Sequence, residues 1–243
     1  MIVLEDKEFE KAVFEQASPI AVPVQLTIGQ DGSLKTLTFS YTRDIAEEFE
    51  ARYASDPLNE KALTWLAETL KARMLPHGYD EIDVESYPLY DYRRADLNED
   101  AVLPACELIS TLEGEEWDDD LALDEFILDP ANPIDRMAVM RDADGKIVCY
   151  AGLNDISEDE GLFEINVECA EEYRRRGYGT SCVVKLTDYL ESLDGAVVQY
   201  ITSHLNIPSI RLAEKAGLTK KNTVLPIVLR KSDEDDEEFF DFT

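Results

Sequence analysis

The sequence predicts an α+β protein in which short strands and amphipathic helices are interspersed along the chain. Apolar residues alternate with polar ones in some runs and recur every three or four positions in others, and turns rich in Gly or Pro separate the runs. The 243 residues include 44 % hydrophobic residues, which is enough for a packed core. This length favours one domain with a smaller companion over two full-sized domains.

Residues 1–80 are predicted to form the smaller α+β unit. Alternating apolar residues on either side of GQDGS indicate a β-hairpin with a glycine-containing loop. Apolar residues spaced by four predict a helix that opens near Asp44. A second helix is expected after Asp56-Pro57, which offers an N-cap and first-turn pair, and it ends before Pro76. No chemical motif stands out in this unit.

The middle of the chain changes pattern. A short strand is expected around residues 90–93, followed by two helical stretches, 98–112 and 118–127. The second stretch opens in the acidic run EGEEWDDD, which the positive end of a helix dipole would favour. A hairpin is predicted over residues 137–153 around the turn DADG, and a further strand over 162–169.

Charge is distributed unevenly along the chain. The net charge is −30, yet residues 171–231 carry +4 and the remainder carries −34. Such a body repels phosphate backbones, so we expect neither nucleic acid nor an anionic membrane as a partner, and cationic ligands are favoured. The basic segment is either a basic helix face or a local anion site. The acidic tail, residues 232–243, is either a solvated end or an arm that docks on a groove.

The cysteine pattern and the N-terminal residues indicate the cellular compartment in which the protein is expected. The four cysteines show neither CxxC pairing nor metal-ligand spacing, which fits a reducing cytosol and predicts no metal. The first residues carry acids where a signal peptide has a basic stretch, and no apolar run is long enough to span a bilayer. We therefore expect a soluble, cytoplasmic, acidic protein. The cysteines are Cys106, Cys149, Cys169 and Cys182.

One segment, LFEINVECAEEYRRRGYG, combines features that suit anion binding. A strand runs directly into three arginines and a Gly-Tyr-Gly turn, and a helix follows. Backbone N–H groups at such a turn converge on a helix N-terminus, where they bind anions. Gly177 and Gly179 allow the backbone to approach a ligand closely, so a pyrophosphate is the natural guest. The segment is neither a P-loop nor a dinucleotide fingerprint.

The residues that follow extend this pattern. A strand is predicted over 196–203, and NIPSIRLAEKAGL then forms a helix with Pro208 in its first turn and Gly217 after its end. Together with the Arg-x-x-Gly-x-Gly turn, this series resembles the GNAT (GCN5-related) N-acetyltransferase superfamily. The resemblance is strongest over residues 162–230 and extends loosely back to about 85, so residues 85–231 are expected to be the GNAT-like domain.

The resemblance implies a fold and a cosubstrate. The fold would be a GNAT-like mixed, mostly antiparallel central sheet flanked by helices, with the N-terminal unit added to it. Acetyl-CoA would be the cosubstrate, with its pantetheine along the strand edge at 167–169 and its pyrophosphate on the amides of 174–180. The implied acetyl-CoA contacts are Val167, Glu168, Cys169, Arg174, Arg175, Arg176, Gly177, Tyr178, Gly179, Thr180, Asn206 and Ser209.

Acetyl transfer to an amine also needs proton transfers. An amine with a pKa of ~10 is mostly protonated at neutral pH and must be deprotonated before it attacks. Glu164 sits where some relatives place a catalytic Glu, and Glu168 and His204 are further candidates for this base. Many family members also place a general-acid Tyr seven residues after the position of Asn206, but here that residue is Ala213.

Two functions follow from these features. The first is an acetyl-CoA-dependent N-acetyltransferase that transfers acetyl directly to a primary amine of a small-molecule or peptide acceptor. The alternative is a catalytically weak CoA-binding sensor or subunit, and a longer acyl-CoA donor is also open. Residues 1–80 are left with three roles: covering the acceptor cleft, pairing two protomers as a homodimer, or extending the core.

Overall fold

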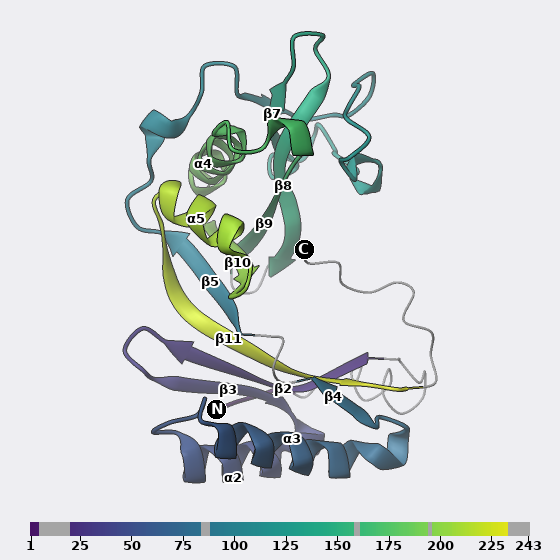
Figure 1. Ribbon diagram of the computed structural model, residues 1–243, viewed down its shortest axis with the longest axis vertical. Helices are drawn as coiled ribbons and strands as arrows, with labels where there is room; N and C mark the ends of the chain where they lie inside the picture. Colours follow the sequence, from purple (N-terminus) through teal and green to yellow (C-terminus); the bar gives the residue numbers. More distant parts are fainter. Residues whose placement is uncertain (5–19, 84–87, 158–160, 194–195, 233–243) are drawn as a thin grey trace. The chain divides into compact units, whose positions relative to one another are not determined.

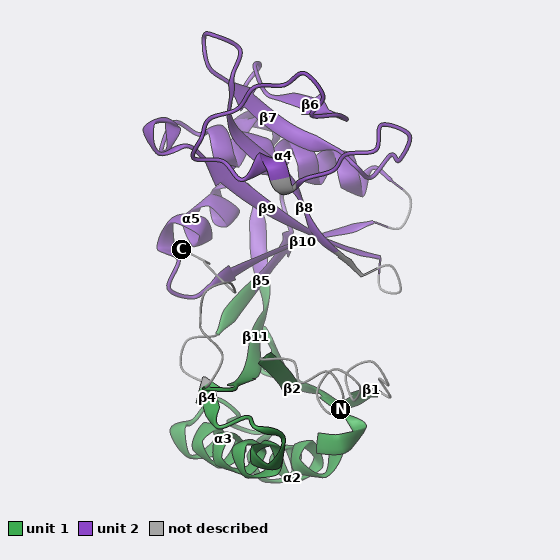
Figure 2. Ribbon diagram, turned by 90° about the vertical axis from the view of Figure 1, so that its right-hand side faces the viewer, with its two compact units in different colours: residues 1–90, 221–243 green, residues 91–220 purple. Residues whose placement is uncertain are grey.

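The structure, a computed structural model, divides into two compact units, each of which mixes strands with helices (Figures 1 and 2). Unit 1 contains residues 1–90 and 221–243, and unit 2 contains residues 91–220. The predicted α+β fold is therefore confirmed. The residues that the structure describes are 1–4, 20–83, 88–157, 161–193 and 196–232.

Unit 1 is a sheet with two helices. Its strands lie in the order β1-β3-β2-β11, with β4 paired to β11. The β2–β3 and β2–β11 pairs are antiparallel, and β1 is parallel to β3. The predicted hairpin around GQDGS is thus confirmed as β2 and β3. The elements are β1 (Ile2–Leu4), β2 (Ile20–Gly29), β3 (Leu34–Phe39), α2 (Arg43–Tyr53), α3 (Glu60–Met74), β4 (Glu81–Asp83) and most of β11 (Leu218–Arg230).

The two helices α2 and α3 lie side by side along the sheet of unit 1 (Figure 1). Four residues of α3 at four-residue spacing, Ala62, Leu66, Leu70 and Met74, are completely buried. They share one core with Phe49 of α2 and with inward-facing residues of β2 and β11. Burial of one face of each helix explains why apolar spacing predicted both helices correctly.

The start of α3 differs from the prediction. Asn59, not Asp56, is the N-cap, because its side-chain oxygen accepts a hydrogen bond from the Ala62 N–H at 2.9 Å. Asp56 instead lies in the preceding turn, where its carbonyl oxygen accepts a hydrogen bond from the Asn59 N–H. Asn and Asp are equally good caps, so residue type alone did not separate the two positions.

Unit 2 contains the segment with the anion-binding pattern. Its strands lie in the order β5-β10-β9-β8-β7-β6. The β6–β7, β7–β8 and β8–β9 pairs are antiparallel and β9–β10 is parallel, which gives the expected mixed, mostly antiparallel sheet. The elements are β5 (Leu89–Arg94), β6 (Glu107–Ile109), β7 (Met137–Arg141), β8 (Ile147–Ser157), β9 (Leu162–Cys169), α4 (Tyr178–Glu191), β10 (Val197–Ser203) and α5 (Ile207–Lys215).

Helix α4 packs on one face of the unit 2 sheet. A methyl group added at Gly179 would lie 3.4 Å from Cγ2 of Val167 on β9 and 4.0 Å from Sγ of Cys149 on β8. The same methyl would lie only 2.9 Å from Leu212 Cδ1 of α5. Glycine at position 179 therefore lets α4, α5 and the sheet approach one another closely.

The two helices predicted between residues 98 and 127 are wrong. The structure has only a 3₁₀ turn (Glu99–Ala101), the three residues of β6, and a second 3₁₀ turn (Leu123–Glu125) in this part. Leu121 and Leu123 are buried in a cluster with Tyr150 of β8, on an irregular chain path.

Local side-chain chemistry explains this correction. Pro104 cannot continue a helix, because it lacks the N–H and its ring clashes with the preceding turn. The Asp118 carboxylate accepts a hydrogen bond from the Asp120 N–H, and the Thr111 hydroxyl accepts one from the Glu113 N–H. Such bonds offer the backbone an alternative to helical hydrogen bonds. The acidic run therefore forms turns.

The end of the chain contributes to unit 1. Residues 222–230 of β11 pair with β2. The last strand of the predicted 85–231 domain therefore lies mostly in unit 1, together with the N-terminal residues. Ser232 donates hydrogen bonds from its N–H and hydroxyl to the Asp80 carboxylate. The remainder of the predicted acidic tail, 233–243, lies outside the described residues. No helix among the described residues is long and apolar enough to cross a membrane.

Gly217 gives a direct test of the unit 2 backbone. Its φ is +85°, its carbonyl oxygen accepts hydrogen bonds from the Ala95 and Asp96 N–H groups, and an added Cβ would lie 1.9 Å from the Asp96 oxygen. We expect Gly217→Ala to lower the free energy of unfolding by about 3 kcal/mol or more. Gly145→Ala is the matched control, because φ is +90° with open space around it, and should cost only about 1 kcal/mol. Equal losses in urea unfolding would contradict this account.

Candidate functional site

Strand β9 leaves its neighbour β10 partway along its length. The parallel β9–β10 ladder ends at the pair Glu164↔Gln199, while the antiparallel ladder to β8 continues to Cys169. Five further residues of β9 therefore present an edge that β10 does not cover, about 16 Å long at 3.3 Å per residue. An extended ligand can lie along such an edge and use its free backbone N–H and C=O groups.

One 3₁₀ turn, Glu171–Tyr173, connects the open edge of β9 to the arginine-rich turn. Gly177 has φ +88° and is the N-cap of α4, and Arg175 has φ +61°. Arg175 is the one non-glycine residue with a positive φ in the described part of the chain. A side chain held in this strained region is typical of ligand-binding sites. The N–H groups of the first turn of α4 have no partners within the helix and are available to an anion.

The three arginines differ in what they contact. Arg174 Nε donates a hydrogen bond to the Cys169 carbonyl at 3.0 Å. Arg176 donates to the Glu172 carbonyl at 2.8 Å and lies over the Tyr173 ring. Arg175 makes no hydrogen bond or ion pair with any described residue. Arg175 is therefore the arginine most available to a ligand, and no described carboxylate pairs with any of the three.

Glu164 lies at the point where β9 and β10 diverge. Asn154 Nδ2 donates a hydrogen bond to Glu164 Oε1 at 2.9 Å. Burial raises the pKa of Glu164, the hydrogen bond from Asn154 opposes this shift, and the charges of Asp155 and Asp91 add to it. Glu164 thus combines partial burial with a carboxylate-rich surrounding, which moves its proton affinity toward that of a general base.

Sequence reasoning missed the partners of Glu164. The hairpin was predicted to end at residue 153, but β8 continues through Asn154 and Asp155 to Ser157. The β8–β9 register shifts between Leu153 and Asp155, so Asn154 is the extra residue of a bulge. Bulges re-aim side chains, and nothing local in the sequence marks this one.

Glu168 has a different environment from Glu164. Its Oε2 accepts hydrogen bonds from the Tyr150 hydroxyl and from the Ala122 N–H, both at 3.1 Å. The carboxylate therefore ties residues 113–126 to the sheet. Four extended residues separate Glu168 from Glu164, about 13 Å, so the two carboxylates do not act on one proton.

Asn166 lies between the two glutamates on the same face of β9. Its side-chain oxygen Oδ1 is buried and has no hydrogen-bond partner among the described residues. Added atoms at Gly152, directly across on β8, would lie 3.7 Å from this oxygen. A buried acceptor without a donor is costly, so this position suits a hydrogen-bond donor from a bound molecule.

The predicted residues of α5 are held by local hydrogen bonds. Asn206 is the N-cap of α5, and its side-chain oxygen accepts a hydrogen bond from the Ser209 N–H at 3.0 Å. The Ser209 hydroxyl in turn pairs with the Tyr200 hydroxyl at 2.5 Å. Burial raises the pKa of Tyr200, which therefore stays protonated. His204 lies in the turn between β10 and α5, five residues beyond Gln199, and is not brought together with Glu164.

The remaining predicted acetyl-CoA contacts occupy the junction of β9 and α4. Val167 faces α4, Tyr178 opens the helix with its ring stacked on Tyr173, and Thr180 is buried in the first turn. Cys169 is half-buried at the end of β9. These residues adjoin the turn, so the structure places the 167–180 contacts in one continuous region.

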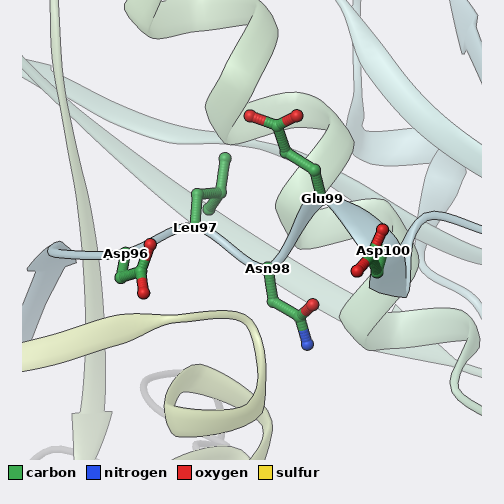
Figure 3. Close-up of a pocket in the computed structure, with 5 residues that line it drawn as sticks. All are labelled: Asp96, Leu97, Asn98, Glu99 and Asp100. Carbon is green, nitrogen blue, oxygen red and sulfur yellow. The ribbon is translucent and has the colours of Figure 1, made fainter.

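A separate concave surface of about 420 Å³ is lined by one short stretch, residues 96–100 (Figure 3). It contains three carboxylates and none of the residues predicted to bind acetyl-CoA or to act in catalysis. Within the described residues, no group of three or more His, Cys, Asp or Glu is arranged to hold a metal ion.

Comparison with known proteins identifies the class of this domain. Residues 102–218 match the family model described as the acetyltransferase (GNAT) family. The fold and this match define an acyltransferase. The matched segment belongs to the GNAT acetyltransferase family, as the strand–turn–helix motif predicted. The sequence has no match among curated proteins.

Solved structures with a similar chain path include three from bacteria. A GCN5-related N-acetyltransferase-like protein from Streptococcus suis 89/1591 is 18 % identical with a TM-score of 0.46, and the alignment covers 87 % of each chain. An acetyltransferase of the GNAT family from Colwellia psychrerythraea is 13 % identical with a TM-score of 0.44, covering 85 % of this chain and 80 % of that one. A GCN5-related N-acetyltransferase from Kribbella flavida is 19 % identical with a TM-score of 0.44. That alignment covers 68 % of this chain and 64 % of the Kribbella chain.

The two glutamates of β9 should respond differently to substitution. Glu168→Ala removes the acceptor of two hydrogen bonds and should lower the free energy of unfolding by about 2 kcal/mol. Glu164→Gln should not lower it at pH 7. Because burial raises the pKa of Glu164, its stabilising contribution belongs to the protonated form and is lost as pH rises through the folded pKa, and Gln mimics that form. Urea unfolding at pH 7 tests this, and a larger loss for Glu164→Gln would be contrary to it.

Proposed function

We propose that this protein transfers the acetyl group of acetyl-CoA directly to a primary amine, with a cationic small molecule or peptide as the acceptor. The observation that carries the proposal is the open edge of β9, which is followed, after one 3₁₀ turn (Glu171–Tyr173), by the Arg175–Gly177 turn and the N-terminus of α4. Acetyl-CoA supplies the activated acyl group as a thioester. The protein's own groups would bind and orient acetyl-CoA and would deprotonate the acceptor amine.

The turn supplies the anion-binding end of the site. Backbone amides within residues 174–180 and the guanidinium of Arg175, which has no partner among the described residues, would hold the pyrophosphate, with the dipole of α4 adding to the attraction. The net charge of +4 on residues 171–231, against −34 elsewhere, favours phosphate at this place alone. The open edge from residue 165 to 169 would hold the extended arm, and the N–H of Val167 would polarise the acyl carbonyl.

The opposite end of the edge suits the amine. Glu164 would accept a proton from the acceptor's ammonium group, which frees the nitrogen lone pair for attack on the acyl carbon. The Asn166 Oδ1 oxygen, which is buried and has no donor among the described residues, would accept a second N–H of the same group. The charges of Asp91 and Asp155 near Glu164 favour a cationic acceptor.

One observation favours a second function, a CoA-binding sensor or subunit with weak catalysis. Ala213, which stands where many relatives place their general-acid Tyr, is completely buried in α5. The structure thus offers no acid at that position for the departing thiolate. A thiolate with a pKa near 8.5 can leave unprotonated and take a proton from water, so catalysis does not require such an acid.

Binding of acetyl-CoA tests the site directly. Gly177→Glu places a carboxylate in the turn that would hold the pyrophosphate, and like-charge repulsion should weaken binding by roughly 100-fold or more in calorimetry. Gly145→Glu is the matched control: its glycine has φ +90° and open space, as Gly177 does, and should bind like wild type. If wild type fails to bind acetyl-CoA, both functions are excluded.

Activity distinguishes the enzyme from the sensor. Glu164→Gln should lower kcat/KM for a cationic amine by roughly 10²- to 10⁴-fold while acetyl-CoA affinity stays unchanged. Because the pKa of Glu164 is raised, wild-type kcat/KM should fall with decreasing pH below that pKa, and the variant should lack this acidic limb. An unchanged rate and pH profile would remove Glu164 as the base. Tight acetyl-CoA binding without transfer to any amine would instead support the sensor.

A further inference from the structure

The four cysteines of the protein are neighbours in unit 2, although they are far apart in the sequence. Cys149 is on β8, Cys169 ends β9, Cys182 is on α4 and Cys106 precedes β6. Cys106 Sγ and Cys182 Sγ are 3.9 Å apart, and Cys182 Sγ also lies 3.9 Å from the Cys149 carbonyl oxygen. Acetyl transfer uses none of these thiols as a reacting group.

The pair Cys149 and Cys169 has the geometry for a cross-strand bond. The two residues are directly opposite each other in the β8–β9 ladder. Their neighbours Val148 and Ala170 are joined by a hydrogen bond from the Ala170 N–H to the Val148 carbonyl at 3.0 Å. Since hydrogen-bonded and non-hydrogen-bonded pairs alternate, Cys149 and Cys169 form a non-hydrogen-bonded pair, with Cα atoms about 4.5 Å apart. Disulfides span Cα separations of about 4.4 to 6.8 Å.

Side-chain contacts agree with this register. The neighbouring thiols of Cys169 and Cys182 lower the pKa of Cys149, whereas Cys149 and burial raise the pKa of Cys169, so the thiolate of the pair is on Cys149. A thiolate is the form that attacks an oxidised sulfur. A metal does not explain the cluster, because the described Cys, His, Asp and Glu residues include no group arranged to hold one.

Exposure distinguishes Cys169 from the others. Cys106, Cys149 and Cys182 are at most 3 % exposed, whereas Cys169 is half-buried. A small oxidant therefore reaches Cys169 first, and Cys149 lies directly across the ladder from it.

We propose that Cys149 and Cys169 are an oxidation site that closes to a cross-strand disulfide when the protein meets a peroxide. Hydrogen peroxide transfers one oxygen to the Cys169 sulfur, which gives a sulfenic acid and one water. Cys149 then attacks that sulfur, the S–O bond breaks and a second water leaves. In sum, two thiols and one peroxide give one disulfide and two waters, and the two sulfurs supply both electrons.

Oxidation at this site is linked to the proposed acetyl-CoA site, and this link rests on the proposed function. Arg174 Nε, in the arginine-rich turn, donates a hydrogen bond to the Cys169 carbonyl at 3.0 Å. Acetyl-CoA bound along the open edge of β9 would cover the exposed part of Cys169. Saturating acetyl-CoA should therefore slow disulfide formation at least tenfold.

The test is peroxide treatment of the full chain, followed by blocking of free thiols with a maleimide in denaturant and peptide mapping without reductant. We expect two of the four thiols to be lost, a cross-linked peptide joining Cys149 to Cys169, and full recovery after dithiothreitol. Cys149→Ser and Cys169→Ser should each abolish this cross-link. Cys106→Ser is the matched control, because it removes a buried thiol of the same cluster and should leave the cross-link intact. Circular dichroism establishes that each variant is folded.

A wild-type protein that shows only a Cys106–Cys182 bond, an intermolecular bond or no bond would overturn the proposal. The experiment with acetyl-CoA tests the proposed function separately from the oxidation site. If the Cys149–Cys169 bond forms but calorimetry shows no acetyl-CoA binding, the oxidation site stands and the proposed function fails. If acetyl-CoA binds and oxidation proceeds at an unchanged rate, the proposed cover over Cys169 is wrong.

Discussion

The site depends on one constraint: β9 is held by β8 along its whole length but by β10 over only three pairs. Where β9 is no longer paired with β10, its extended conformation is held by hydrogen bonds to β8, and the antiparallel β8–β9 ladder extends over the whole strand. The packing of α4 on the same strands supports it, since even a methyl group added at Gly179 would lie 3.4 Å from Val167. An edge with free backbone groups is thereby kept in a rigid part of the molecule, where a ligand does not have to order it first.

The same strand serves opposite purposes on its two faces. Its α4 side is apolar or sulfur-containing and packs tightly. The other side carries Glu164, Asn166 and Glu168. Glu168 holds residues 113–126, and Asn166 Oδ1 has no donor within the described part of the chain. Alternation along a strand makes this separation possible with no additional elements, since each successive residue changes face.

Periodic segments could be predicted from the sequence, and segments held by long-range contacts could not. Strand β9 was predicted at 162–169, where the structure has it, because alternation and the following turn are local signals. Residues 98–112 and 118–127 were predicted as helices, but Leu121 and Leu123 are instead buried against Tyr150, and the Ala122 N–H is bonded to Glu168, contacts with residues distant in the sequence. The motif that points to acetyl-CoA is local and could be found. The bulge at Asn154 that directs an amide onto Glu164 depends on strand register, which single residues do not reveal.

The division of the chain also has a consequence for biosynthesis. Unit 2 is one continuous stretch, whereas unit 1 needs its last strand, residues 221–230, from the end of the chain. During translation the N-terminal strands and helices therefore leave the ribosome before β11, which completes their sheet. The edge of β2 that pairs with β11 stays unpaired until some 130 further residues have been synthesised. The acyltransferase domain, although later in the sequence, is able to finish folding first. Holdase chaperones would be expected to act on the first 90 residues of this chain rather than on its catalytic half.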